Sequence, residues 1–145
     1  MAKPDLLAII NPHSGTQSMA RKQQLREQVL RRATLAGYTP DVVLTTGPGH
    51  ATELAAAAVK QGVGRVLAIG GDGTMNEVAR ALRHTATALG IVPIGSGNGL
   101  ARHLNIPLNN HRAVDRALVG KPVVIDGGEV NEFPFLCTAG IGFDA

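Results

Sequence analysis

Residues 66–74 read Val-Leu-Ala-Ile-Gly-Gly-Asp-Gly-Thr, an apolar run that ends in three glycines around one carboxylate, Asp72. The apolar run predicts a buried strand, and residues 75–83 predict a helix. A strand that turns on glycines into a helix leaves backbone N–H groups at the positive end of the helix dipole, which suits a phosphate. A carboxylate beside a phosphate needs a metal ion or a transferable proton between them. The run therefore favours phosphate chemistry with a divalent metal, although such turns also occur for packing reasons alone.

Short apolar runs alternate with longer helical patterns along most of the chain. Strands are expected at 6–10, 41–45, 65–69 and 89–94, and shorter ones at 123–125, 129–130 and 133–138. Helices are expected at 18–36, 51–61, 75–83 and 100–104, and a last one that Asn110 caps and that ends near Gly120. The alternation predicts an α/β fold, a three-layer, mostly parallel sheet with helices on both faces.

Four glycine- or asparagine-rich loops leave the carboxyl ends of these strands, at 11–15, 46–50, 70–74 and 95–99. In parallel sheets ligands bind beyond the carboxyl ends of the strands, so we expect the four loops to meet at one site. Packing alone explains the last loop poorly, because Ser96 and Asn98 stand among glycines there.

Some of these residues also have an ordinary structural interpretation. Thr74 with Glu77 three residues later is a capping box, in which Thr74 is the N-cap of the helix. Residues 11–15 read equally well as an Asn-Pro turn. His50 is suited to the N-terminus of a helix with or without a ligand.

Size and composition restrict the class of protein. The 145 residues are 44% hydrophobic, 3% aromatic and carry a formal net charge of +3, which indicates one domain with an aliphatic core. Five basic residues between 21 and 32 indicate a solvated helix face, with attraction to an anionic membrane or to a nucleotide as the alternative. Without an aromatic stacking platform or a known motif, nucleic-acid binding is not expected.

Cysteine usage and hydropathy point to a soluble, cytoplasmic protein. The single cysteine, Cys137, lies in a strand-like run and excludes an internal disulfide. No signal peptide is visible, and the apolar run at 6–10 is too short to span a bilayer. The chain stops just after a strand-like run without a polar tail, so we expect a fragment of a longer protein.

Three blocks, residues 11–15, 70–78 and 93–102, together resemble the catalytic domain of diacylglycerol kinases and the related sphingosine and bacterial lipid kinases. Residues 126–128 and 140–145 are similar to later blocks of that family. The element at 70–73 alone is shared with NAD kinases and phosphofructokinases. The resemblance implies an NAD kinase/phosphofructokinase-like domain over residues 1–145, with its C-terminal edge near 123–145. In the family a β-rich second domain follows.

The resemblance further implies transfer of the γ-phosphate of ATP, with Mg²⁺, to the hydroxyl of diacylglycerol or a sphingosine-like lipid. Asp72 is then the catalytic residue and the magnesium ligand, and Asp144 contacts the lipid head group. The nucleotide-binding residues that it implies are Asn11, Ser14, Gly15, Thr46, Gly71, Asp72, Gly73, Thr74, Asn76, Ser96 and Asn98. Gly99 stands where many bacterial members have Asp, a departure closer to sphingosine or ceramide kinases, so the acceptor lipid stays open.

A lipid acceptor implies a protein that is peripheral to a membrane. Whether the protein forms a homodimer stays open. Two other functions also stay open. One is an NAD kinase-like or sugar kinase, and the other is a domain that binds nucleotide without turnover in isolation.

Overall fold

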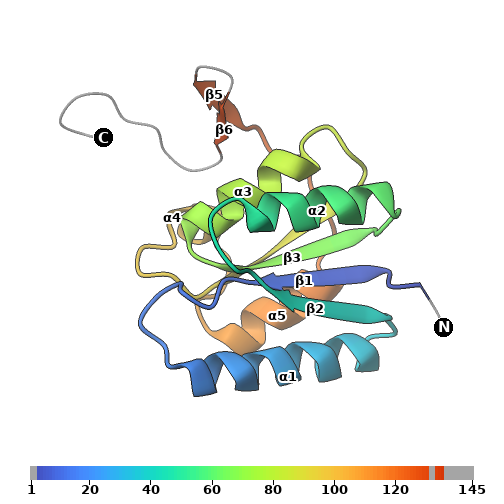
Figure 1. The fold of residues 1–145 in the computed structure, drawn as a ribbon, viewed down its shortest axis with the longest axis vertical. Helices are drawn as coiled ribbons and strands as arrows, with labels where there is room; N and C mark the ends of the chain where they lie inside the picture. Colours follow the sequence, from blue (N-terminus) through green and yellow to red (C-terminus); the bar gives the residue numbers. More distant parts are fainter. Residues whose placement is uncertain (1–2, 131–132, 136–145) are drawn as a thin grey trace.

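The computed structural model describes residues 3–130 and 133–135, and its centre is a parallel sheet of four strands (Figure 1). The strands are β1 (Leu6–Ile10), β2 (Pro40–Leu44), β3 (Arg65–Gly70) and β4 (Ala88–Pro93), in the spatial order β2-β1-β3-β4. The chain therefore reverses its winding direction between β1 and β3. Such a reversal leaves a crevice at the carboxyl ends of the strands, where ligands bind. The loops after β1 and β3 border this crevice.

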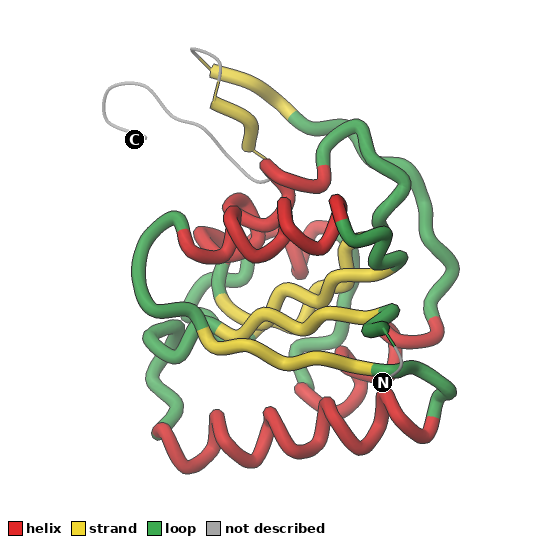
Figure 2. Tube along the Cα trace, turned by 45° about the vertical axis from the view of Figure 1, so that its right-hand side comes forward, coloured by secondary structure: helices red, strands yellow, loops and turns green. Residues whose placement is uncertain are grey.

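Helices cover both faces of the sheet, as the alternation of strands and helices predicts (Figures 1 and 2). One face carries α1 (Met19–Leu35) and α5 (Asn110–Val119). The other face carries α2 (His50–Lys60), α3 (Asp72–Leu82) and the short α4 (Gly99–His103). The predicted three-layer α/β fold is confirmed.

The central strand β1 shows how the core is built. Alternate residues of a strand point to opposite faces of the sheet. Leu6, Ala8 and Ile10 pack in the cluster with α1 and α5, whereas Leu7 and Ile9 pack in the cluster with α2 and α3. All five side chains are buried, which is why the strand reads as one continuous apolar run.

Two helix starts show how well local signals place the ends of elements. Ser18 caps α1, and its Oγ accepts a hydrogen bond from the Arg21 amide at 3.2 Å. The N-cap of α5 is Asn109 rather than the predicted Asn110, and its Oδ1 accepts from the Arg112 amide at 3.1 Å. Either asparagine can cap a helix, so the sequence leaves a one-residue ambiguity.

The predicted capping box at the start of α3 is wrong. The helix begins at Asp72, with Gly71 as its N-cap, and no side chain caps it. Thr74 is therefore the third helical residue, and Glu77 lies three residues too late to reach the N-cap amide. The turn is tighter than predicted because β3 ends at Gly70 and a single glycine in extended conformation leads into the helix.

After α5 the described chain ends in a small antiparallel pair, β5 (Gly128–Val130) and β6 (Phe133–Phe135). The predicted strand at 123–125 is wrong: Val123 is 79% and Val124 is 99% exposed, and the segment pairs with no strand among residues 3–130 and 133–135. An isolated segment has no partner for the backbone hydrogen bonds that make a strand. Residues 136–138 of the last predicted strand, Cys137 and Asp144 lie outside the described residues.

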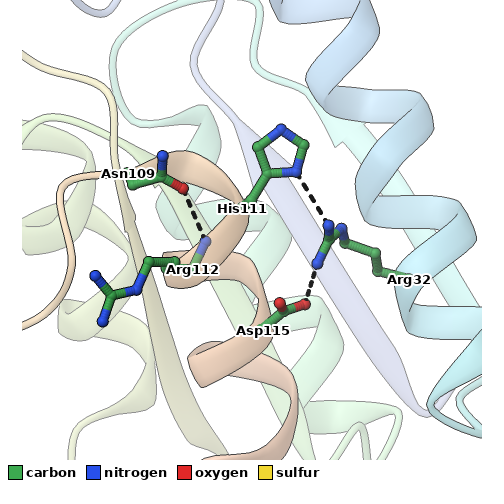
Figure 3. A network of polar contacts seen from close by, with 5 residues as sticks. All are labelled: Arg32, Asn109, His111, Arg112 and Asp115. Atoms are coloured by element: carbon green, nitrogen blue, oxygen red, sulfur yellow. Dashed lines mark hydrogen bonds and ion pairs between the residues drawn. The ribbon is translucent and has the colours of Figure 1, made fainter.

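The basic stretch between 21 and 32 is partly structural. Arg32 Nη1 pairs with Asp115 Oδ1, and Arg32 Nη2 lies 3.1 Å from His111 Nδ1, so α1 is joined to α5 (Figure 3). Lys22 is buried, with 4% of its surface exposed. The solvated-face interpretation holds for Arg21 and Arg31, which are exposed. Within the described part of the chain, no helix combines the length and apolar character that crossing a bilayer requires.

Candidate functional site

The loops that follow β1 and β3 are tied together at the carboxyl edge of the sheet. Ser14 Oγ, in the β1 loop, accepts a hydrogen bond from the Gly71 amide at 3.3 Å. Asn11 Nδ2 donates to Thr74 Oγ1, in the first turn of α3, at 3.1 Å. Residues more than fifty positions apart in the sequence therefore meet where the topology places the crevice.

Two glycines are required because the backbones of three loops approach closely. A Cβ atom on Gly15, whose φ is +66°, would lie 2.0 Å from the carbonyl oxygen of Ile94. A Cβ atom on Gly95 would lie 2.5 Å from the Cα of Gly71. Carbon atoms in contact normally stay about 3.5–4.0 Å apart. The loops after β1, β3 and β4 therefore meet backbone to backbone, which confirms that these three loops gather at one edge.

Asp72 links the β3 loop to the β4 loop. Its Oδ2 accepts from the Gly99 amide at 2.8 Å, and its Oδ1 accepts from the Leu100 amide at 3.0 Å. These are the first amides of α4, whose own N-cap, Asn98, makes no side-chain cap bond. Asn98 instead closes on Gly95, with bonds of 3.0 and 2.8 Å to its amide and carbonyl. Asp72 therefore caps α4 from a neighbouring loop.

The loop after β2 reaches the site through α3. The Gly49 amide donates to Glu77 Oε1 at 2.6 Å, and Thr52 Oγ1 donates to the Glu77 carbonyl at 2.8 Å. Within the loop, the Thr46 amide donates to His50 Nδ1 at 3.0 Å. Glu77 thus joins the start of α2 to α3 through two hydrogen bonds.

The residues singled out from the sequence occupy different positions at this edge. Gly15, Gly73, Thr46 and Ser96 are exposed, whereas Thr74 is buried. The described residues with intermediate exposure are Asn11, Ser14, Gly71, Asp72, Asn76 and Asn98. Asn11 is engaged at both ends of its amide, because its Oδ1 also accepts from the His13 amide at 2.9 Å. Asn11 and Thr74 therefore hold the loops together, while Thr46, Gly73 and Ser96 present polar groups to solvent.

Helix α3 offers backbone donors at the same edge. The amides in the first turn of a helix have no partner within the helix, and no side chain caps α3. They lie at the positive end of an eleven-residue helix, next to Ser14 and the β4 loop. Such a helix start suits a phosphate group.

Asp72 is the sole acidic residue in the four loops at 11–15, 46–50, 70–74 and 95–99. Among residues 3–130 and 133–135, no three His, Cys, Asp or Glu side chains gather as a metal-binding group. Each carboxylate oxygen of Asp72 accepts one amide and keeps a second lone pair. Mg²⁺ commonly binds one or two carboxylates together with phosphate oxygens and water. The donor set therefore fits a magnesium ion that arrives with a phosphate ligand.

Comparison with known proteins identifies the family of this chain. Residues 5–130 match the family model of the diacylglycerol kinase catalytic domain. The chain belongs to this family. The resemblance found in the sequence is thereby confirmed.

Two curated members show how much of a full-length relative the chain spans. A diacylglycerol kinase of Bacillus subtilis (strain 168) is 38% identical over 137 residues, which are 92% of this chain and 44% of the relative. A protein of Pectobacterium atrosepticum named "Probable lipid kinase YegS-like" is 38% identical over 135 residues, 89% of this chain and 42% of the relative. The chain spans less than half the length of these relatives.

A solved structure shares the fold. The crystal structure of a diacylglycerol kinase from Bacillus anthracis str. Sterne superposes with a TM-score of 0.78 at 24% identity. The match covers 94% of this chain and 46% of that one.

Two cations of this diacylglycerol kinase-type domain contact the loops at the site, although neither was predicted from the sequence as a site residue. Lys22 Nζ donates to the Pro12 carbonyl in the β1 loop, and Arg102 Nε donates to the Gly97 carbonyl in the β4 loop at 2.9 Å. Each cation thus holds a carbonyl of a loop at the site. A signal for Lys22 was available, because it falls on the buried face of α1, three residues before Leu25.

Two surface hollows lie on the α1–α5 side of the molecule and do not coincide with the loops. One, of about 400 Å³, is lined by Arg31, Arg32, Leu35, Ala36 and Asp115 near the C-terminal end of α1. The other, of about 330 Å³, lies between the N-terminal half of α1 and the start of α5. The candidate site is therefore defined by the hydrogen bonds between the loops at the carboxyl edge and not by either hollow.

Proposed function

We propose that this chain forms the ATP-binding part of a lipid kinase, which transfers the γ-phosphate of ATP to a lipid hydroxyl. The observation that carries the proposal is the meeting of three glycine-rich loops around Asp72, in a chain of the diacylglycerol kinase catalytic domain family. The name of the Bacillus subtilis relative supports diacylglycerol as the acceptor. The Gly99 departure keeps a sphingosine-like lipid as the second candidate.

Phosphoryl transfer depends on holding the phosphates in line and neutralising their charge. In the proposed complex, the uncapped first turn of α3 and the hydroxyls of Ser14 and Ser96 hold the phosphates. Thr46 borders the nucleotide from the β2 loop. The remaining nucleotide-binding candidates support these groups from within the loops.

Asp72 is the proposed catalytic residue. When bound, Mg²⁺ would neutralise charge on the phosphates, and Asp72 would hold it through the lone pairs that the α4 amides leave free. As the sole carboxylate in the four loops, Asp72 is also the group available to take the proton of the acceptor hydroxyl.

The whole enzyme is proposed to be larger than this domain. Because the chain spans 44% of the Bacillus subtilis relative, we propose that residues 1–145 are its nucleotide-binding domain and that a β-rich domain completes the active site. Asp144 would then lie near the lipid head group. A lipid acceptor would place the enzyme at the cytoplasmic surface of a membrane, as a peripheral protein.

Calorimetry with Mg-ATP, followed by phosphate-transfer assays on diacylglycerol, sphingosine and NAD, tests this proposal. The expected result is Mg²⁺-dependent binding of ATP by this chain, with transfer to either lipid when the proposed β-rich domain is present. Transfer to NAD would favour an NAD kinase-like enzyme instead. Binding without transfer, even when the β-rich domain is present, would favour a domain that binds nucleotide without turnover, and a chain that binds no Mg-ATP would contradict the proposal.

A further inference from the structure

Glu77 connects two elements that carry parts of the proposed nucleotide site. Its Oε1 accepts from the Gly49 amide at 2.6 Å, and its carbonyl accepts from Thr52 Oγ1 at 2.8 Å. Glu77 lies on α3, the helix that begins with Asp72. Gly49 and Thr52 belong to the start of α2 and the loop before it.

The position of Gly49 explains why this bond matters. Gly49 is the N-cap of α2, has a φ of +83°, and has no side chain with which to cap the helix. The Glu77 carboxylate accepts from the amide of the N-cap residue itself, as the glutamate of a capping box does, but from the neighbouring helix and at the positive end of the α2 dipole. A carboxylate that accepts a backbone N–H makes a strong, charge-assisted bond.

The bond to Gly49 fixes the rest of the β2 loop. The next residue, His50, accepts the Thr46 amide through Nδ1 at 3.0 Å, which closes the loop on itself. Thr46 is exposed at the end of this closed loop. The placement of Thr46 relative to Asp72 therefore depends on the contact between Glu77 and Gly49.

We infer that Glu77 is a positioning residue for the nucleotide: its carboxylate holds the β2 loop against α3, so that Thr46 and the start of α3 face the same ligand. This inference rests on the proposed function and deepens it. Glu77 acts through Gly49 and touches neither the phosphates nor the reacting atoms. Loss of its acceptor oxygen should weaken nucleotide binding.

Three variants separate this role from a general contribution to folding. Glu77→Ala removes the acceptor, whereas Glu77→Gln keeps an oxygen at the same position and should restore binding. Glu53→Ala is the matched control, because Glu53 is an exposed acidic residue in the first turn of α2, the helix whose N-cap amide Glu77 accepts. Circular dichroism at the assay temperature establishes that each variant is folded.

Two measurements read out the effect. Without nucleotide, hydrogen exchange of residues 46–50 should become faster in Glu77→Ala and stay unchanged in Glu53→Ala, because the Gly49 amide loses its acceptor. In calorimetry with Mg-ATP, Glu77→Ala should raise Kd about tenfold or more, the loss expected for one charge-assisted bond. Glu77→Gln should stay within about threefold of the wild-type Kd.

Unchanged exchange at 46–50 in folded Glu77→Ala would overturn the inference, as would an unchanged Kd. A Glu77→Gln variant that binds as weakly as Glu77→Ala would also overturn it, because the acceptor oxygen would then not be what matters. A wild-type chain that binds no Mg-ATP would overturn the proposed function and the nucleotide role of Glu77 with it. The exchange measurement would then still decide whether Glu77 holds the loop.

Discussion

Replacing Asp72 by alanine removes the acceptor of two backbone hydrogen bonds, from the Gly99 amide at 2.8 Å and the Leu100 amide at 3.0 Å. A buried charge-assisted bond contributes about 1.5–3 kcal/mol. Asp72 is only partly buried, so water can replace part of this loss. A lost helix cap costs about 0.5–2 kcal/mol, and we expect Asp72→Ala to lie at the upper end of that range, near 2 kcal/mol. At about 3–4 °C per kcal/mol for a chain of this size, the melting temperature should fall by about 6–8 °C.

Thermal unfolding followed by circular dichroism, without nucleotide or metal, measures this effect. Asp115→Asn is the matched control, because Asp115 forms an ion pair with Arg32 on the other face of the sheet and is 55% exposed. Surface pairs contribute about 0.2–1 kcal/mol, so its melting temperature should fall by no more than about 3 °C. A residue present only to bind metal would make no stabilising contact in the metal-free chain. Its loss would then leave the free energy of unfolding unchanged or higher. An Asp72→Ala chain that melts at or above the wild-type temperature would therefore refute the capping of α4.

Two further substitutions test the close approach of the loops and the buried cation. Gly95→Ala would bring a Cβ atom within 2.5 Å of Gly71 Cα and should cost about 1–3 kcal/mol, whereas Gly73→Ala meets nothing within 4 Å and should be neutral or slightly stabilising. Denaturant titration of both variants checks this, and equal effects would contradict the backbone contact. Lys22→Met keeps the apolar stem but leaves the Pro12 carbonyl without its cation, so it should lower stability by about 1–3 kcal/mol and raise the Kd for Mg-ATP. A variant with unchanged stability and unchanged Kd would show that Lys22 does not hold the β1 loop.

The fold was predictable because its signals are repeated along the chain. The central strands β1 and, after Arg65, β3 are buried on both faces, so they read as apolar runs, and each is followed by a helix-period pattern. The gathering of loops was predictable from topology alone, since parallel strands end at one edge. Neither inference needs the identity of any single side chain.

The partners of individual polar residues were not predictable, because they depend on contacts between distant segments. Thr74 and Glu77 have the spacing of a capping box, yet Gly71 starts the helix earlier and both side chains bond to other loops. The segment at 123–125 has the composition of a strand, but composition does not provide the neighbouring strand that pairing needs. Local sequence patterns therefore indicate which helix or strand a residue belongs to, but they do not determine its hydrogen-bond partner in a distant segment.

The two bonds between Asp72 and α4 bear on the proposed chemistry as well as on stability. With one lone pair of each oxygen directed at an α4 amide, the carboxylate cannot rotate without losing both bonds. Its free lone pairs are then held in fixed directions before any ligand arrives. Such preorganisation favours the binding of a metal ion or a proton, because the carboxylate is already oriented when the chain folds and does not have to be reoriented when the ligand arrives. An aspartate is suited to this arrangement, because the additional methylene of a glutamate would shift the carboxylate away from the two amides that orient it.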